Sequence, residues 1–320
     1  MTRPDPTGTL ARPPTRFDKG ADRAFRGLTA LASLLAVLLV VGIVAQIATQ
    51  AEPAVREYGV EFLTTSKWDP SGKKFGVLPQ IAGTLYSSVL GVALGSLFGV
   101  TVAIVLTQDF LPPRLEAVAK GVVELLSAVP SVVYGLWGIF VVIPAMRPLA
   151  NATHEAFGGL PLFGTRLAGP GLLPAAFVLA IMVLPTVTAI SRDALAAVPG
   201  KLREAAFGLG ATRWEAIVKV VLPTASRGIF GAIVLAFGRA VGETMALAML
   251  LGNSNSFSWS LFAPGTTLAT LMANQWPESG AVEKGALMYA GLVLLGITLL
   301  INSVGTLILR RAVRVEEAHQ

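Results

Sequence analysis

Six long apolar stretches limit what this chain can fold into more than any other feature of its sequence. A helix needs about 20 apolar residues to cross roughly 30 Å of hydrocarbon, and each stretch is close to that length. None shows the strict alternation of a barrel strand, so helices are the expected structure. The predicted spans are Leu28–Ala48, Gly83–Leu106, Val122–Met146, Leu172–Ile190, Gly228–Leu251 and Ala286–Leu309.

The composition supports an integral membrane protein without catalytic machinery. Of the 320 residues, 53% are hydrophobic and only 14% are charged, whereas soluble domains carry about 25% charge. The chain has no cysteine and two histidines, which excludes disulfides, thiolate metal sites and a histidine metal cluster. Phosphate-binding loops, nucleophile elbows and zinc-protease motifs are also missing from the sequence. We therefore expect an all-α integral membrane protein that is no enzyme and holds no cofactor or metal.

The distribution of basic residues indicates the orientation in the lipid bilayer. If the N-terminus is cytoplasmic, 17 of the 25 Lys and Arg residues fall in cytoplasmic segments and seven in outer loops. One, Arg239, lies within a span. This bias follows the positive-inside rule, so both termini are expected in the cytoplasm of a multi-pass protein. The net charge of +6 is then a topology signal, and no nucleic-acid partner is expected.

The same patterns divide the chain into segments. Residues 1–24 are rich in Pro, Thr, Arg and Asp, which is typical of a disordered tail. The remaining segments are an uncleaved anchor helix at 25–50, an extracytoplasmic loop at 51–82, a transmembrane domain at 83–310 with a cytoplasmic loop at 194–227, and a tail at 311–320.

The loop between the fourth and fifth spans predicts a helix–turn–helix. Gly210 can supply a left-handed turn after a first helix. Thr212 with Glu215 three residues later forms a capping-box pattern for a second helix, which Leu222-Pro223 is expected to end. The first helix and turn carry Glu204, Ala205, Ala206, Leu209, Gly210 and Ala211. Small apolar residues flanked by charges suit either partner docking or a connector on the membrane surface.

A resemblance favours docking. The spacing E-A-A-x3-G-x9-[IV]-x-L-P, present from Glu204 to Pro223, resembles the EAA loop of ABC importer permeases. In that family the loop forms the coupling helix that inserts into the cytoplasmic ATPase. The resemblance implies a MetI-like, type I importer core, and it assigns ATPase coupling to the six residues from Glu204 to Ala211 named above.

Further blocks are similar to a narrower family, the phosphate importer permeases of the PstC type. These blocks are Lys67–Pro70, Pro79–Thr84, Pro130–Trp137 and Gly238–Ala246. The resemblance implies import of inorganic phosphate across the bacterial cell membrane. It also implies a PstA-type second permease subunit, a PstB-type ATPase dimer and a PstS-type phosphate-binding protein as partners.

Two charged residues, Arg239 and Glu243, lie inside the fifth predicted span. Arg239 comes 11 residues after Gly228, which places it about 16 Å along the helix and near the middle of the membrane. Charges at this depth face a bundle interior or a wet pathway. Arg239 can offer a forked donor to an oxyanion, with Glu243 neutralising it in the empty state. The alternative is a buried ion pair that fixes helix register.

Two rival functions remain open at this point. One is an ABC permease for another oxyanion, such as sulfate or molybdate. The other is a secondary transporter or channel that works without ATP, which would have no reason to keep an EAA loop.

Overall fold

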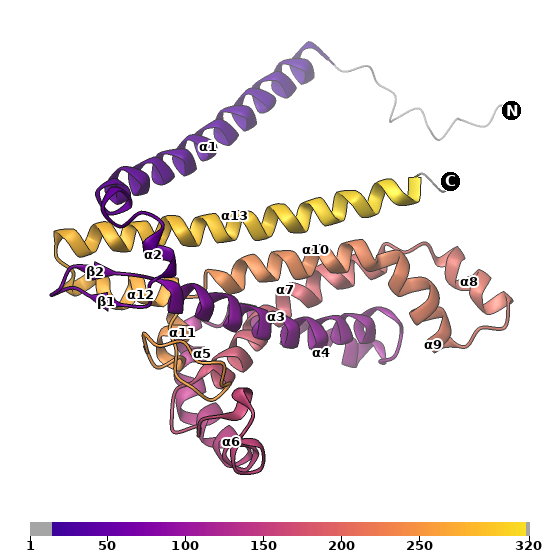
Figure 1. Cartoon of the computed structure of the whole chain (residues 1–320). Helices are drawn as coiled ribbons and strands as arrows, with labels where there is room; N and C mark the ends of the chain where they lie inside the picture. Colours follow the sequence, from indigo (N-terminus) through magenta and orange to yellow (C-terminus); the bar gives the residue numbers. More distant parts are fainter. Residues whose placement is uncertain (1–14, 318–320) are drawn as a thin grey trace, which may run out of the picture. The chain divides into compact units, whose positions relative to one another are not determined.

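The computed structural model describes residues 15–317, and nearly all of its elements are helices (Figure 1). The chain divides after Gln50 into two units. Within the described residues, the first unit is the part of α1 (Arg16–Tyr58) that precedes residue 51, a helix with exposed apolar side chains such as Leu35 and Val41. In the part of the chain that the structure describes, six helices are long and apolar enough to cross a membrane, which confirms the all-α, six-span prediction.

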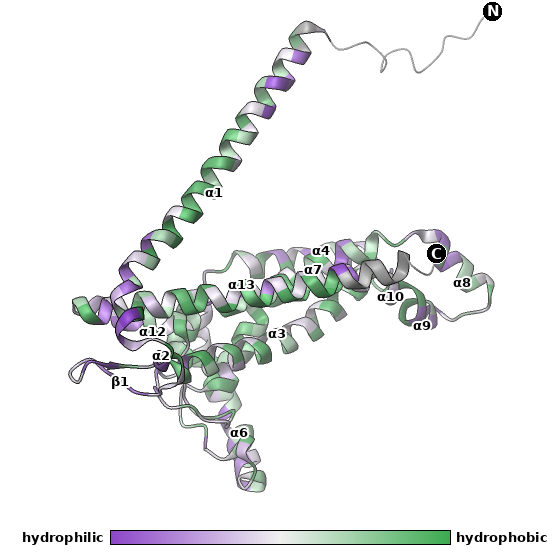
Figure 2. Cartoon of the chain, turned by 45° about the horizontal axis from the view of Figure 1, so that its top comes forward, coloured by the Kyte–Doolittle hydropathy of each residue, from purple (hydrophilic) through white to green (hydrophobic). Residues whose placement is uncertain are grey.

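The second unit contains a helical bundle and several short elements. Its longer helices are α3 (Leu78–Thr107), α4 (Pro113–Ala128), α6 (Ile143–Phe157), α7 (Leu172–Ala196), α10 (Leu222–Val241) and α13 (Ala281–Glu317), and the short α5 (Ser131–Trp137) leads through a π-helical turn into α6. Its short elements are α2 (Glu61–Thr64), β1 (Trp68–Asp69), β2 (Lys74–Phe75), α8 (Gly200–Gly208), α9 (Arg213–Ala216), α11 (Met245–Leu250) and α12 (Leu268–Gln275). Most of α3 and α13 has hydrophobic colouring, whereas α9 is marked by hydrophilic residues (Figure 2).

Helix α7 lies at the centre of the bundle and packs against α3 and α10. The α3–α7 contact depends on the absence of side chains along one stripe of α3. A Cβ atom added to Gly95 would lie 2.5 Å from Val183 Cγ2 and 2.8 Å from the Ala180 carbonyl oxygen. A Cβ atom at Gly91 would lie 2.8 Å from Leu179, and one at Gly99 would lie 2.9 Å from Val187. The stripe therefore serves packing, as small residues do in other membrane helix pairs.

A second core lies at one end of the unit, opposite α8 and α9 (Figure 1). Here the antiparallel pair β1–β2 and helix α2 pack against α12 and α13. Phe62 stacks on Tyr289 with ring centroids 4.3 Å apart, and Trp68 Nε1 donates to Glu283 Oε1 at 3.2 Å. The predicted outer loop is therefore a small, ordered cap on the bundle.

The third predicted span, Val122–Met146, is divided in the structure. Helix α4 ends at Ala128 and α5 begins at Ser131, so a membrane-length helix runs from Ser131 to Phe157 through a π-helical turn. Pro130 explains the break, because a proline disfavours helical backbone in the residue before it. The Tyr134 hydroxyl donates to the Leu126 carbonyl oxygen at 2.7 Å, which satisfies one of the free carbonyls at the end of α4.

The fifth predicted span, Gly228–Leu251, is also displaced. Its helix begins at Arg213 and ends at Val241, and Gly242–Thr244 separate it from α11. The expected helix end at Leu222-Pro223 is wrong. A π-helical turn at Ile217–Val221 precedes Pro223 and accommodates the missing amide donor, so the helix passes through.

The chain termini differ partly from the sequence-based division. Helix α1 already begins at Arg16, where an Asp22–Arg26 ion pair of 2.8 Å spans one turn, so residues 16–24 are helical. Residues 1–14 of the predicted tail lie outside the described residues. At the other end α13 continues to Glu317, through most of the stretch assigned to the tail at 311–320.

Candidate functional site

The predicted helix–turn–helix is present, and we call Gly200–Ala216 the coupling hairpin. Gly210 has a φ of +85°, and the amides of Gly210 and Ala211 donate to the carbonyls of Phe207 and Ala206 at 2.9 and 3.0 Å. This pattern is a Schellman motif. It requires a residue with left-handed backbone conformation, which glycine adopts without strain. The predicted capping box also forms between Thr212 and Glu215. Local sequence signals therefore determine the shape of the hairpin.

The hairpin presents apolar surface that no other part of residues 15–317 covers. Leu209 is 90% exposed and Trp214 is 63% exposed. Ala205, Ala206, Leu209, Gly210 and Ala211 line one hollow of about 510 Å³. Ala206 is buried at its base, and Glu215 and Lys219 stand at its edge as an ion pair of 3.1 Å. Such a patch of exposed large apolar side chains indicates an interaction surface.

Glu204 lies apart from this group. It lines a second hollow of about 320 Å³ on the other side of the hairpin, together with Gln108, Arg203 and Arg213. The structure thus brings five of the six predicted coupling residues to one surface and places the sixth next to the turn between α3 and α4.

The coupling hairpin is continuous with the helix that carries Arg239. From Arg213 to Val241 the backbone is helical without interruption, so Arg239 lies about 39 Å from Arg213 along one rod. One continuous helix thus joins the second arm of the coupling hairpin to Arg239.

Arg239 contacts the central helix of the bundle. Its Nη1 donates to Thr186 Oγ1 on α7 at 3.3 Å. The side chain is exposed, and within residues 15–317 no carboxylate lies within ion-pair distance of its guanidinium. The guanidinium therefore keeps donors available for an anion.

Glu243 does not lie one turn above Arg239 on the same helix, because α10 ends at Val241. Its Oε1 accepts from the amide of Ala246 at 3.3 Å, at the start of α11. The expected Arg239–Glu243 ion pair is absent from the described structure, and Glu243 instead caps the next helix. A negative charge suits that position, because the amides there are unpaired and the helix dipole is positive.

A cavity with both apolar and charged lining residues lies between α4 and α7, on the hairpin side of Arg239. It measures about 200 Å³, and Thr186, which binds Arg239, is in its wall. Lys120, Arg192 and Glu124 also line it. Lys120 pairs with Glu116 at 2.5 Å, and Arg192 pairs with Asp193 at 3.2 Å. Hydroxyl groups and charged side chains of both signs thus continue from Arg239 toward the coupling hairpin, and each of the two cations has a carboxylate partner.

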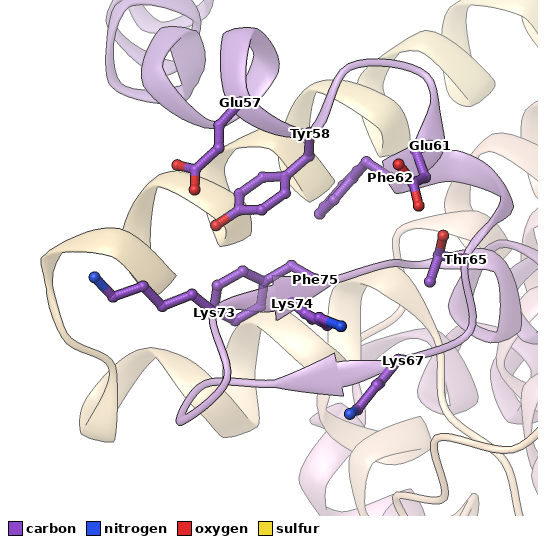
Figure 3. A pocket seen from close by; sticks show the side chains of 9 residues that line it. All are labelled: Glu57, Tyr58, Glu61, Phe62, Thr65, Lys67, Lys73, Lys74 and Phe75. Atoms are coloured by element: carbon purple, nitrogen blue, oxygen red, sulfur yellow. The ribbon is translucent and has the colours of Figure 1, made fainter.

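A further hollow of about 430 Å³ lies at the opposite end, beside the β1–β2 pair (Figure 3). Lys67, Lys73 and Lys74 are among its lining residues, while Tyr58 and Phe62 face Phe75 on its inner side. The turn is well ordered, since Asp69 Oδ1 accepts from the Gly72 amide at 3.0 Å. This bond and nearby Lys67 lower the pKa of the Asp69 carboxyl below its ordinary value.

Comparison with known proteins shows which family the chain belongs to. Residues 91–314 match the family described as binding-protein-dependent transport system inner membrane component. The chain belongs to this family. The phosphate transport system permease protein PstC of Mesorhizobium japonicum is 38% identical over 91% of this chain and 90% of its own length. The corresponding protein of Pasteurella multocida is 35% identical over 91% and 92%.

Solved structures of this kind of transport component share the fold. A bacterial alginate ABC transporter in complex with its periplasmic protein matches 93% of this chain and 98% of its own chain, with a TM-score of 0.63 at 16% identity. The inward-facing MetNI methionine ABC transporter matches 73% of this chain and 95% of its own, with a TM-score of 0.54 at 20% identity. The MetI-like permease fold expected from the sequence is therefore confirmed.

Two residues at these sites, Thr186 and Gln108, could not be identified from the sequence, because neither belongs to a recognisable motif. Thr186 and Gln108 are ordinary polar residues at the middle and the end of apolar helices. Their partners, Arg239 and Arg213, lie 53 and 105 positions away along the chain.

Proposed function

We propose that this chain is the permease subunit of an ATP-driven importer of inorganic phosphate. The observation that carries the proposal is its 38% identity, over 91% of its length, to a protein named a phosphate transport system permease. The Arg239 guanidinium, which has no carboxylate partner in the described structure, supports an anionic substrate. Arginine suits a tetrahedral oxyanion because its planar fork donates two parallel hydrogen bonds.

The coupling hairpin is the surface on which an ATPase subunit docks. The exposed Leu209 and Trp214 and the hollow beside Ala205 support this assignment. A PstB-type ATPase dimer needs two such surfaces, and a PstA-type second permease would supply the other. Closure of the ATPase would displace α9 and, through the continuous helix, move Arg239.

The orientation follows from the placement of the basic residues. With both termini in the cytoplasm of a bacterial cell, the coupling hairpin faces the ATPase and the β1–β2 pair faces outward. An anion would then pass from the outer end to Arg239 and leave along the cavity lined by Lys120 and Arg192. Glu243 would act by holding the start of α11, at the helix break next to this route.

The outer end offers a basic surface to a phosphate-binding protein of the PstS type. Lys73 and Lys74 are exposed at the tip of the β1–β2 pair, and the Asp69–Gly72 bond holds the turn that presents them. Charges at the rim of such a contact mainly set the rate of association.

Reconstitution of the complete complex with different binding proteins tests the substrate. The complex in sealed vesicles should import phosphate when given ATP and a phosphate-binding protein, and excess sulfate should not compete. Stimulation by a sulfate- or molybdate-binding protein, with no response to the phosphate binder, would assign the permease to another oxyanion. Uptake that needs no nucleotide would assign it to the ATP-independent carriers.

A further inference from the structure

The end of α3 is fastened to both arms of the coupling hairpin through one residue, Gln108. Arg203 on α8 donates from Nη1 to Gln108 Oε1 at 3.3 Å. Arg213 on α9 donates from Nη2 to the Gln108 main-chain oxygen. Gln108 is 4% exposed, and its Nε2 donates to Thr107 Oγ1 at 3.3 Å. The side-chain amide is thus held in one orientation with all its heavy polar atoms bonded.

The turn that follows Gln108 is held by the same arginine. The Arg213 guanidinium carbon lies 4.4 Å from the centroid of the Phe110 ring. Asp109, between the two contacts, has a φ of +51°, a left-handed conformation that is uncommon for non-glycine residues and that Asp adopts more readily than most. Arginine alone can combine a forked donor with stacking on an aromatic face, and lysine cannot replace it in this geometry.

These contacts connect the coupling hairpin to the interior by a route other than α10. Helix α3 packs tightly along α7 through Gly91, Gly95 and Gly99, so the two helices cannot slide independently. Helix α7 in turn carries Thr186, the partner of Arg239. A displacement of the hairpin therefore reaches both sides of the Thr186–Arg239 contact, one side through α10 and the other through α3 and α7.

We propose that Gln108, Arg203 and Arg213 are positioning residues that make α3, α7 and α10 move as one body with the coupling hairpin. We call these three residues the Gln108 clasp. The proposal rests on the proposed docking of an ATPase on the hairpin, and it adds the claim that α10 alone does not transmit the motion. Without the clasp, the hairpin and α10 can still follow the ATPase, but α3 and α7 no longer move with them, so the Thr186–Arg239 contact between α7 and α10 is not kept during the motion.

The test compares ATP hydrolysis with phosphate uptake in the complete complex, reconstituted in vesicles with a phosphate-binding protein. Arg213→Lys keeps the charge and removes the fork and the stacking, and Gln108→Leu removes the side-chain acceptor. Each should co-purify with the ATPase and hydrolyse ATP, while the phosphate imported per ATP falls about tenfold, within the range of coupling terms carried by packed networks. Gln108→Glu keeps an acceptor for Arg203 and should retain the wild-type ratio.

Arg114→Ala is the matched control, because it removes an exposed cation from the start of α4 without touching the clasp. It should behave as wild type. A normal ratio of uptake to hydrolysis in Arg213→Lys and Gln108→Leu would overturn the clasp and leave α10 as the transmitting element. Loss of ATPase co-purification would overturn it too, because these residues would then belong to the docking surface. A wild-type complex without ATP-dependent phosphate uptake would instead contradict the proposed function itself.

Discussion

Arg239 on α10 donates to Thr186 on α7 across 3.3 Å, and no carboxylate of the described structure neutralises it. This relationship separates two interpretations that the sequence left open. An ion pair with Glu243 would fix helix register, whereas a guanidinium bound only to a hydroxyl keeps its charge for another anion. The structure has the second arrangement, and Thr186 is in the wall of a cavity that Lys120, Arg192 and Glu124 also line.

Replacing Arg239 should impair transport and leave assembly intact. Hydrogen bonds to charged groups contribute about 1.5–3 kcal/mol, so Arg239→Ala should lower kcat/KM for phosphate about 10- to 100-fold. Thr186→Val, which removes only the hydroxyl partner, should have a smaller effect. Initial rates of labelled phosphate uptake, with co-purification of the partners as the control, measure both. Wild-type uptake by Arg239→Ala would remove this residue from the anion route.

Glu243 should act as a helix cap more than as a counter-charge. Glu243→Ala removes the acceptor for the Ala246 amide, and loss of such a cap costs about 1 kcal/mol, so the complex should unfold at a lower temperature. Glu243→Gln keeps an acceptor oxygen and should retain most of the stability and uptake. Thermal unfolding in detergent and uptake rates provide the comparison. If the Gln variant is as defective as the Ala variant, the carboxylate charge is required, and the capping role is insufficient.

Gly210 and Gly208 form a matched pair for the coupling hairpin. Gly210 has a φ of +85°, where a side chain costs about 1–2 kcal/mol, so Gly210→Ala should distort the turn and weaken ATPase co-purification. Gly208 is helical, and a Cβ there would meet nothing within 4 Å. Gly208→Ala should therefore be neutral or slightly stabilising. Equal ATPase recovery in the two variants would show that the left-handed turn is not needed for docking.

Charge reversal at the tip of the β1–β2 pair should slow capture of the binding protein. Lys73→Glu combined with Lys74→Glu changes exposed side chains without touching the aromatic core beneath them. We expect slower association and a weaker dependence on ionic strength, with unchanged dissociation, because rim charges act mainly through electrostatic steering. Arg166→Glu, on the loop before α7, is the control. An unaltered association rate would exclude this surface from the contact.

Local signals predicted much of the fold and of the coupling hairpin. Hydropathy gave the six spans, and Gly210, Thr212 and Glu215 specified the turn and the cap, because each acts through neighbours in the chain. The helix breaks were not predicted in position. The apolar runs continue through Pro130 and Gly242, so hydropathy alone does not reveal where a helix ends and the next begins.

Contacts between distant residues were beyond local reasoning. Gln108 meets Arg213, and Thr186 meets Arg239, only after α3, α7 and α10 have packed. The prediction that a helix ends at Leu222-Pro223 was wrong because it considered only the local sequence. A proline normally ends a helix, but here the preceding π-helical turn shifts the register and lets the rod continue to Arg239.

The central claim is that this permease moves phosphate only when an ATPase drives its coupling hairpin. The most direct measurement is phosphate uptake into sealed vesicles, comparing the complete complex with ATP and with a non-hydrolysable analogue, and the purified chain alone. The account predicts uptake only by the complete complex hydrolysing ATP. Uptake by the chain alone, or uptake sustained with the analogue, would contradict it.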